Sequence, residues 1–501
     1  MKSLGVVIVV AAVALGTTVA ARDFSAEVED FFRRGKTDSA LAASQAFVVA
    51  YSDSAEAHGY LGTMYTEVGR LEDALAAFEY VTVLNPVQVD GYRNWALLQA
   101  RVGRVDAAVT TLSKGLARIP DSAALLPERA LIRGNAGQVE EAAGDFEAVI
   151  KLAPKNLDAY HSLALLLTAS GEFDRALQAL DRGLTERPGD ARLLVNKGGV
   201  LHSKGDVSAA FQAYRAANDS APDDSLVHRA FGFMAAEVGS LAVAEAAWAE
   251  SVRLNKNDLE VRNLLGQLYI DQGDGKKALE QFEAIIQIEP RAAFARHTLG
   301  FLYRSKGESA LARREYRACI QIEPGWTEPY KSLARLHVEE GHLDSALAVY
   351  NAALAVDSTD ATIHNNVGFL YSLAKKWPDA KAAYQNAIDF TQDPEMLREV
   401  MKNLSTIEAI EAGKVQVRHI VVRTSAKAAE LLSQLKSGSD FADLAREHSI
   451  DASAKQGGNF GFFERGDLHS GFEAAAFALE VGDVSEVIRT PVGFHIIQRM
   501  N

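Results

Sequence analysis

Residues 259–292, LEVRNLLGQLYIDQGDGKKALEQFEAIIQIEPRA, carry the pattern that decides the fold. Their apolar residues recur at helical spacing and predict two amphipathic helices, which meet in a tight turn at Gly273. Gly266 marks a point where a neighbouring helix comes close, and Pro290 stands where the second helix cannot continue. A single hairpin of this kind cannot bury its apolar faces alone, so we expect copies of it on either side.

The copies recur at a constant step of 34 residues. Alanine takes the position of Ala278 in eleven successive copies, from Ala40 to Ala380, without an insertion. Glycine recurs in the same way at the turn and is absent only at Lys375. An aromatic residue or leucine follows the alanine by four positions in all but the first copy, and proline usually closes the copy. This pattern resembles the tetratricopeptide repeat (TPR), a helical hairpin that stacks on its neighbours.

The resemblance predicts the organisation of most of the chain. We expect a degenerate capping repeat at residues 22–54, ten TPRs at 55–392 and a capping or linker helix at 393–413. Terminal repeats are often atypical because one of their faces meets water. The expected fold is an all-α, right-handed superhelical TPR solenoid, followed by a small α+β domain at residues 414–501.

The composition argues against two classes of protein, those that bind nucleic acid and those held together by disulfides. A net charge of −14 argues against binding to nucleic acid, which requires a basic surface. The single cysteine, Cys319, excludes an internal disulfide framework.

The first 21 residues have the features of a signal peptide. Lys2 supplies a positive charge, an apolar run extends to Leu15, and Val19 and Ala21 suit a cleavage before Arg22. The alternative is an uncleaved N-terminal membrane anchor, because the segment from Leu4 to Ala21 is just about long enough to span a bilayer. In both cases we expect an exported protein, in the periplasm or cell envelope of a bacterium.

From Gln416 onward the 34-residue helical pattern is replaced by a different pattern of residues. A β-branched run predicts a strand, and Ser425 and Asp440 stand where helix N-caps are expected. The expected order is β-α-α-β-α-β-β, with strands at 417–422, 460–463, 484–490 and 494–500 and helices at 426–436, 441–448 and 471–479.

Four strings in this last segment carry a second resemblance: RHIVV, DFADLAREHSIDASAKQGGNFGFFERGDL, FEAAAFAL and GDVSEVIRTPVGFHIIQ. In this order and spacing they resemble the parvulin family of peptidyl-prolyl cis–trans isomerases. The resemblance implies a four-stranded antiparallel sheet with helices and an isomerase site on one sheet face. Rotation about an X–Pro bond breaks no covalent bond, so we expect neither a metal nor a cofactor.

The resemblance also implies the site residues. The catalytic positions correspond to His419, Asp451, Thr490 and His495, and the substrate-binding positions to Phe460, Phe463, Leu468 and Phe472. Alternatively, the histidines are mainly structural and Asp451 only caps a loop. The loop after His419 carries only Arg423 as a basic residue, whereas phospho-selective members carry a basic cluster there. Phospho-selectivity is therefore not expected.

The two resemblances together predict an exported prolyl isomerase or foldase. The TPR groove would dock proline-containing client polypeptides or protein partners, and the last domain would isomerise their X–Pro bonds. The alternative is a non-catalytic scaffold or chaperone whose parvulin module is degenerate and only binds proline segments. Candidate groove residues share one first-helix position: Phe233, Gln267, Phe301, Arg335 and Phe369. Alternatively, these phenylalanines pack against the adjacent helix and never meet solvent.

The string HVEEGH at residues 337–342 has a superficial likeness to a zinc-protease motif. Its spacing is not H-E-x-x-H, His337 takes the repeat position of Tyr269, and Gly341 is the turn glycine. The sequence therefore predicts a structural role for these residues and no metal site.

Overall fold

The computed structural model describes residues 19–501, with side chains from residue 24 onward. The predicted signal peptide or anchor lies outside the described residues, except for its last three, which begin α1. No helix among the residues described is both long and apolar enough to cross a bilayer. The chain divides into two compact units, Met1–Gln272 and Gly273–Asn501.

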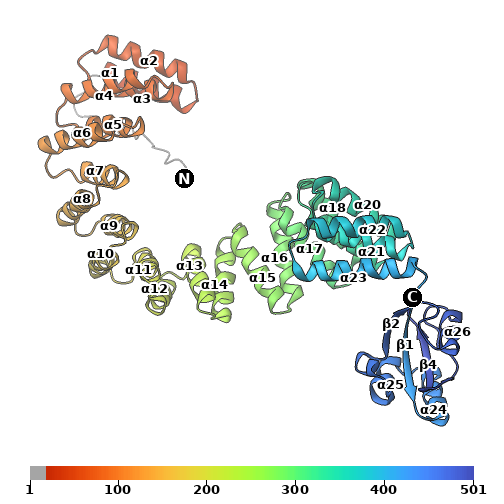
Figure 1. Cartoon of the computed structure of the whole chain (residues 1–501). Helices are drawn as coiled ribbons and strands as arrows, with labels where there is room; N and C mark the ends of the chain where they lie inside the picture. The colour runs from red at the N-terminus through yellow and green to blue at the C-terminus, as the bar shows by residue number, and fades with distance from the viewer. Residues whose placement is uncertain (1–18) are drawn as a thin grey trace. The chain divides into compact units, whose positions relative to one another are not determined.

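The first unit consists of helices that pack pairwise into hairpins, each of which contacts the next (Figure 1). Its helices are α1 (Val19–Arg33), α2 (Thr37–Ala50), α3 (Ala55–Glu67), α4 (Leu71–Leu84), α5 (Val89–Arg101), α6 (Val105–Arg118), α7 (Leu125–Asn135), α8 (Val139–Leu152), α9 (Leu157–Ala169), α10 (Phe173–Glu186), α11 (Ala191–Lys204), α12 (Val207–Ser220), α13 (Ser225–Glu237), α14 (Leu241–Leu254) and α15 (Leu259–Asp271).

The second unit continues the helical repeats and ends in a sheet-containing domain. Its repeat helices are α16 (Gly275–Ile288), α17 (Ala293–Ser305), α18 (Ser309–Ile322), α19 (Glu328–Glu339), α20 (Leu343–Val356), α21 (Ala361–Leu373), α22 (Trp377–Phe390) and α23 (Pro394–Glu411). The expected fold class, a TPR solenoid followed by a small α+β domain, is confirmed.

The repeated residues have the roles that their spacing predicts. Gly273 lies between α15 and α16 with a φ of 77°, a left-handed conformation that glycine adopts at little cost. Ala278 is fully buried on α16. A helix glycine leaves room for an aromatic ring, because a Cβ added at Gly368 would stand 2.7 Å from the ring of Tyr384. At Lys375, where the turn glycine is missing, the backbone still adopts a φ of 56°.

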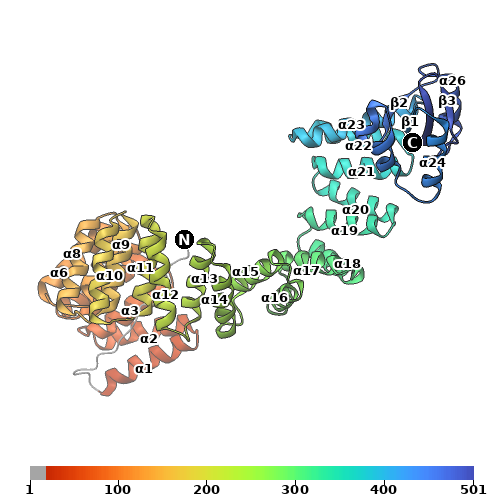
Figure 2. The same cartoon turned by 90° about the horizontal axis from the view of Figure 1, so that it is seen from below.

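The C-terminal domain is built on a four-stranded antiparallel sheet with the strand order β2-β1-β4-β3. Figure 2 shows α24 and α26 beside this sheet. Its elements are β1 (Val415–Val422), α24 (Ser425–Lys436), α25 (Phe441–His448), the 3-10 helix η1 (Ala452–Gln456), β2 (Asn459–Phe463), α26 (Ser470–Ala478), β3 (Ile488–Thr490) and β4 (Gly493–Arg499).

One strand is shorter than the sequence predicts. We expected a strand at residues 484–490, but only Ile488–Thr490 forms one, and Val484 makes an isolated bridge with Gln498. The reason lies in Ser485, whose hydroxyl accepts a hydrogen bond from the backbone N–H of Ile497 at 2.9 Å. The Ser485 side chain thus binds a backbone N–H group that would pair with a backbone carbonyl group in a regular strand ladder.

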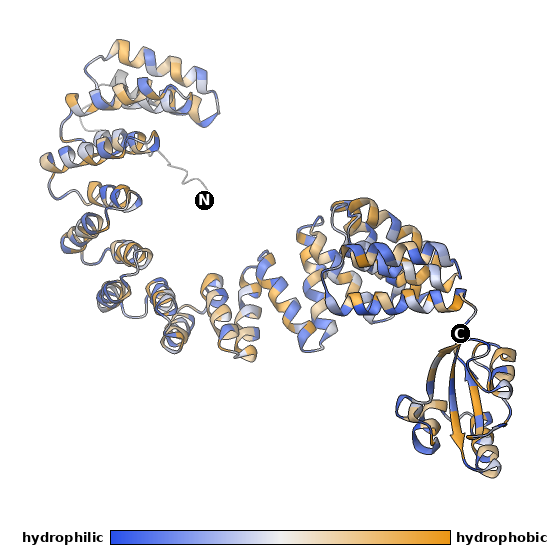
Figure 3. Cartoon of the chain, viewed as in Figure 1, coloured by the Kyte–Doolittle hydropathy of each residue, from blue (hydrophilic) through white to orange (hydrophobic). Residues whose placement is uncertain are grey.

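Alternate residues of β1 face two different cores. Ile420 and Val422 pack with α24 and α25, whereas Val415 and Val417 pack with α26. Figure 3 shows hydrophobic and hydrophilic residues mixed along both the strands and the repeat helices. His419 has the same parity as Val417 and therefore belongs to the α26 side of the sheet.

Candidate active site

Two histidines meet on the α26 side of the sheet. His419 lies on β1 and His495 on the neighbouring strand β4, where His495 is paired with Val421. Because this register offsets the two histidines by two residues, they are diagonal neighbours on one face, with ring centroids 5.5 Å apart. Both are almost fully buried, at 3% and 4% exposure.

An aromatic floor surrounds the histidines. The ring of Phe472, on α26, stands edge-on to both, at 5.7 Å from His419 and 5.3 Å from His495. Phe460, on β2, lies 5.1 Å from His419 and 5.9 Å from Phe472. Four elements, β1, β2, α26 and β4, thus contribute rings to one continuous surface.

This surface forms the bottom of a cleft of about 590 Å³. Its lining includes His419, Val421, Ile450, Asp451, Phe460, Asp467, Leu468, His469, Phe472, Thr490, Pro491, Val492 and His495. Seven of the eight site residues expected from the sequence therefore line one cleft. The exception is Phe463, which is buried behind Phe460 and Phe472 at 6.0 and 5.8 Å and supports them from the core.

Asp451 caps the 3-10 helix η1 and also lies beside His419. Its carboxylate accepts a hydrogen bond from the backbone N–H of Ser453 at 2.8 Å and so caps η1. The same oxygen lies 3.1 Å from Nε2 of His419. Partial burial would raise the pKa of Asp451, but hydrogen bonding by Ser453 and His419 lowers it to about 2. The carboxylate is therefore ionised at neutral pH.

Both histidines are neutral at neutral pH. Burial lowers the pKa of His419, and burial together with the neighbouring His419 lowers the pKa of His495 to about 4. The Thr490 hydroxyl lies 2.7 Å from Nε2 of His495 and also accepts the backbone N–H of Val492. One hydroxyl thus ties the imidazole of β4 to the turn after β3.

Close backbone packing fixes the first strand against the loop before β2. The backbone N–H of His419 donates to the carbonyl of Gly458 at 2.8 Å. A Cβ at Gly458 would lie 2.4 Å from the carbonyl oxygen of His419, so only glycine fits there.

Several wall residues of the cleft, and the residues that support them, are not among those expected from the sequence. Glu473 is buried, and its carboxylate accepts the backbone N–H groups of Gly466 and Leu468 at 2.9 and 2.7 Å. It therefore holds the loop that carries Leu468 and two further wall residues, Asp467 and His469. A glutamate as the fourth residue of a helix carries no sequence signal for this role.

The groove residues are all exposed on their helices, with Phe233, Phe301 and Phe369 at 38%, 42% and 48%. Phe233 and Gln267 belong to the first unit, and Phe301, Arg335 and Phe369 to the second. Phe233 still makes an edge contact with Trp248 at 5.7 Å.

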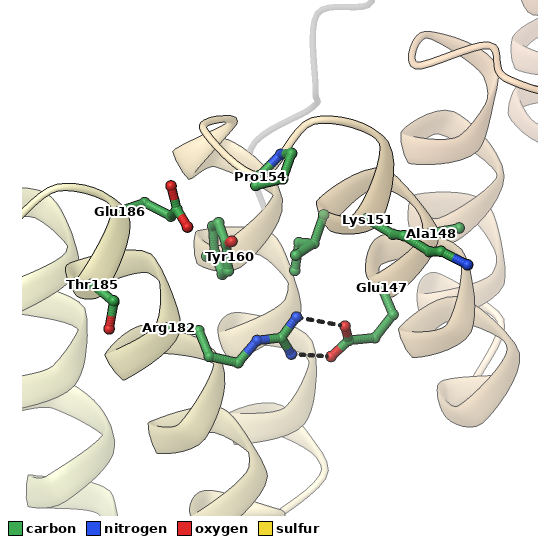
Figure 4. Close-up of a pocket in the computed structure, with 9 residues that line it drawn as sticks. Glu147, Ala148, Lys151, Pro154, Tyr160, Arg182, Thr185 and Glu186 are labelled. Atoms are coloured by element: carbon green, nitrogen blue, oxygen red, sulfur yellow. Dashed lines mark hydrogen bonds and ion pairs between the residues drawn. The ribbon is translucent and has the colours of Figure 1, made fainter.

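A second hollow, of about 660 Å³, lies between α8, α9 and α10 (Figure 4). Arg182 spans it with two hydrogen bonds to the carboxylate oxygens of Glu147, at 2.7 and 3.0 Å. The ring centroid of Tyr160 lies 5.8 Å from the guanidinium carbon of Arg182. Because Arg182 and Glu147 already pair with each other across neighbouring repeats, we interpret this hollow as a feature of repeat packing.

Comparison with known proteins agrees with this geometry. Residues 419–501 match the family described as PPIC-type PPIASE domain. Tetratricopeptide-repeat families match residues 25–88, 65–123, 135–194, 167–235, 235–293, 295–325 and 334–374. The chain is a tetratricopeptide-repeat protein with a C-terminal PPIC-type peptidyl-prolyl isomerase domain.

The curated relatives match only a short part of the chain. The chain is 42% identical over 88 residues to "Foldase protein PrsA" of Bacillus subtilis, which is 17% of this chain and 30% of that protein. It is 42% identical over 94 residues to "Chaperone SurA" of Methylobacillus flagellatus, which is 17% of this chain and 22% of that protein. The chain thus spans less than a third of either relative. Among solved structures, yeast Tom70 aligns with 84% of this chain and 99% of its own, at 13% identity and a TM-score of 0.33.

Proposed function

We propose that this protein is an exported foldase whose PPIC-type domain isomerises X–Pro bonds in polypeptides that the TPR region holds. The observation that carries the proposal is the cleft in which Phe472 and Leu468 form an apolar wall beside the ionised carboxylate of Asp451. The N-terminal segment is the basis for proposing export to the periplasm or cell envelope.

The chemistry needs only these residue types. Amide resonance sets a rotation barrier of roughly 18–20 kcal/mol, and no bond has to break. An apolar pocket formed by Phe472, Leu468 and Phe460 holds the proline ring and removes water from the amide. This favours the twisted, less polar transition state over the planar ground state.

The polar groups of the cleft have different proposed roles. Asp451 is about one third exposed and reaches the cleft, so it is the candidate that acts on the twisting peptide directly. His419 and His495 are buried, and we assign them positioning roles: His419 orients Asp451, and His495 with Thr490 fixes the opposite wall. This assignment combines the catalytic and the structural interpretations of the histidines.

The repeat region is proposed to bind the client. In the second unit, Phe301 on α17, Arg335 on α19 and Phe369 on α21 are exposed at the same first-helix position of consecutive hairpins. Exposed aromatic side chains at a regular interval are suitable anchors for an extended chain. Arg335, between them, suits an acidic or carbonyl group of that chain.

The experiment measures cis–trans exchange in a series of short X–Pro peptides with the full chain. The proposal predicts acceleration, no preference for phosphoserine before proline, and a lower kcat in Asp451→Asn, which retains the capping oxygen but loses the charge. An absence of acceleration for every peptide, with a folded protein, would favour the non-catalytic scaffold.

Docking has its own test. Joint replacement of Phe301 and Phe369 by serine should weaken binding of a reduced, carboxymethylated unfolded protein, whereas Val356→Ser, at a similarly exposed site on α20, should not. Equal binding by both variants would mean that this surface does not hold the client.

A further inference from the structure

The turn between α19 and α20 brings together three side chains that could ligate a metal ion. His337 is in the last turn of α19, Glu340 follows it, and His342 precedes α20. Their ligand atoms all lie within 4.8 Å of one another. The linear spacing did not predict this cluster, because the chain reverses direction at Gly341, where φ is 78°.

The distances suit a common ion. Oε2 of Glu340 lies 3.8 Å from Nδ1 of His337 and 3.3 Å from Nδ1 of His342. Zinc bonds imidazole nitrogen and carboxylate oxygen at about 2.0–2.2 Å, which places neighbouring tetrahedral ligands roughly 3.3–3.6 Å apart. The two imidazole rings are 6.2 Å apart, with their planes at 61°.

His337 provides an independent indication of a ligand. Its side chain is only 9% exposed, and its buried Nδ1, which faces this carboxylate from 3.8 Å, has no hydrogen-bond partner among the described residues. An unpaired buried nitrogen is costly unless something binds it.

His342 stands at the N-cap position of α20, where most of the equivalent residues in other repeats, such as Ser240 and Glu308, make no side-chain capping bond. Asp206 and Asp274 stand at the same N-cap position and accept the backbone N–H three residues later. His342 makes no such capping bond and instead approaches Glu340. Its ring is thus available to the cluster.

Arg313, on α18, is a competitor for the same carboxylate. Its Nη2 lies 2.6 and 2.5 Å from the two oxygens of Glu340. The guanidinium group neutralises Glu340 and repels a dication, so its removal should strengthen metal binding.

We propose that His337, Glu340 and His342 form a binding site for a borderline transition-metal ion such as Zn²⁺, with Arg313 limiting its affinity. Two imidazoles and one carboxylate favour Zn²⁺, Ni²⁺ or Cu²⁺ over Mg²⁺ or Ca²⁺. A bound ion would cross-link the end of α19 to the start of α20 and stabilise that hairpin.

The test is a titration of the full chain with ZnCl₂ after dialysis against a chelator, in competition with a chromophoric zinc indicator. The wild type should bind one more equivalent than His337→Gln/His342→Gln. His342→Gln alone should raise the Kd by about 10–100-fold or more, the cost typical of losing a group that supports a metal site. Arg313→Gln should lower the Kd. Co²⁺ should give the absorption of a four-coordinate ion in the wild type only.

The matched control is His202→Gln, which removes an exposed histidine that pairs with Glu237 at 2.7 Å and should leave Zn²⁺ binding unchanged. Because His342 is 62% exposed, its replacement is expected to leave the fold intact, as circular dichroism would verify. Equal stoichiometry and affinity in the wild type and the His342→Gln variant would overturn the proposal.

Discussion

The repeat helices and the C-terminal domain show two different ways in which a sequence specifies structure. In the repeats, a residue such as Ala278 has counterparts at every step of 34, and each is buried by its own hairpin and the next. In the C-terminal domain, His419, Asp451 and His495 each occur once and meet only because the sheet brings distant segments together. We therefore expect a change in one repeat to stay local and a change in the cleft to affect the whole site.

The largest expected effect falls on the part that occurs once. Phe472→Ala should abolish most isomerase activity because it removes the floor of the cleft, and a truncation of this kind typically costs about 3–5 kcal/mol of stability. Circular dichroism and thermal melting should show intact repeats. Phe477→Ala is the matched control, since it lies on the same helix and contacts Phe463 instead of the histidines. A folded Phe472→Ala protein with full activity would show that the cleft is misassigned.

A change in a repeat should stay local. Ala278→Leu overpacks a fully buried position and should cost roughly 1–3 kcal/mol, measured as lost hydrogen-exchange protection in α16 and α17. Isomerase activity should not change. Ala352→Leu, at an exposed alanine of α20, is the control. If Ala278→Leu lowered the melting temperature of the C-terminal domain equally, the two regions would not be independent.

Acid should weaken the C-terminal domain through its buried histidine. His495 takes up a proton at pH 6.5 when unfolded but only near pH 4 when folded. The unfolded state therefore binds more protons between these values, and stability should fall as the pH drops from about 6.5 to about 4. Activity should stay level from pH 8 to 6, where His495 in the folded protein remains neutral. Urea titrations of the His495→Gln variant should show a shallower pH dependence, and an unchanged slope would assign the effect to other groups.

The smallest effect tests the one irregular turn. Lys375 adopts a left-handed backbone conformation, which costs a residue with a Cβ roughly 1–2 kcal/mol. Glycine avoids this cost but loses more conformational entropy on folding, which offsets part of the gain. Lys375→Gly should therefore raise the stability of the α21–α22 hairpin by up to about 1 kcal/mol. Lys376→Gly, one residue later and at negative φ, should destabilise it. A loss of stability in Lys375→Gly would mean that the lysine side chain makes a compensating contact.

The sequence predicted the helices well because the same residue pattern recurs in every repeat. Each copy therefore supports the helix boundaries assigned to the others. It located most of the cleft through resemblance, but it did not distinguish wall from support: Phe463 is a core residue, and Glu473 holds the loop of Leu468. It also overestimated one strand, since the side chain of Ser485 replaces a backbone partner. Such features depend on contacts between distant segments, which neither periodicity nor spacing encodes.

The central claim is that the C-terminal domain isomerises prolines in chains that the repeats hold. The most direct measurement compares the full chain with the segment from Lys414 to Asn501 on a short X–Pro peptide and on an unfolded protein whose refolding is limited by proline isomerisation. We expect the full chain and the segment to act on the peptide at equal rates. On the unfolded protein, the full chain should be faster by roughly 100-fold, because docking raises the effective concentration of the client at the cleft. Failure of both forms to accelerate the peptide would contradict the assignment of the cleft, and equal rates on the protein would contradict the role of the repeats.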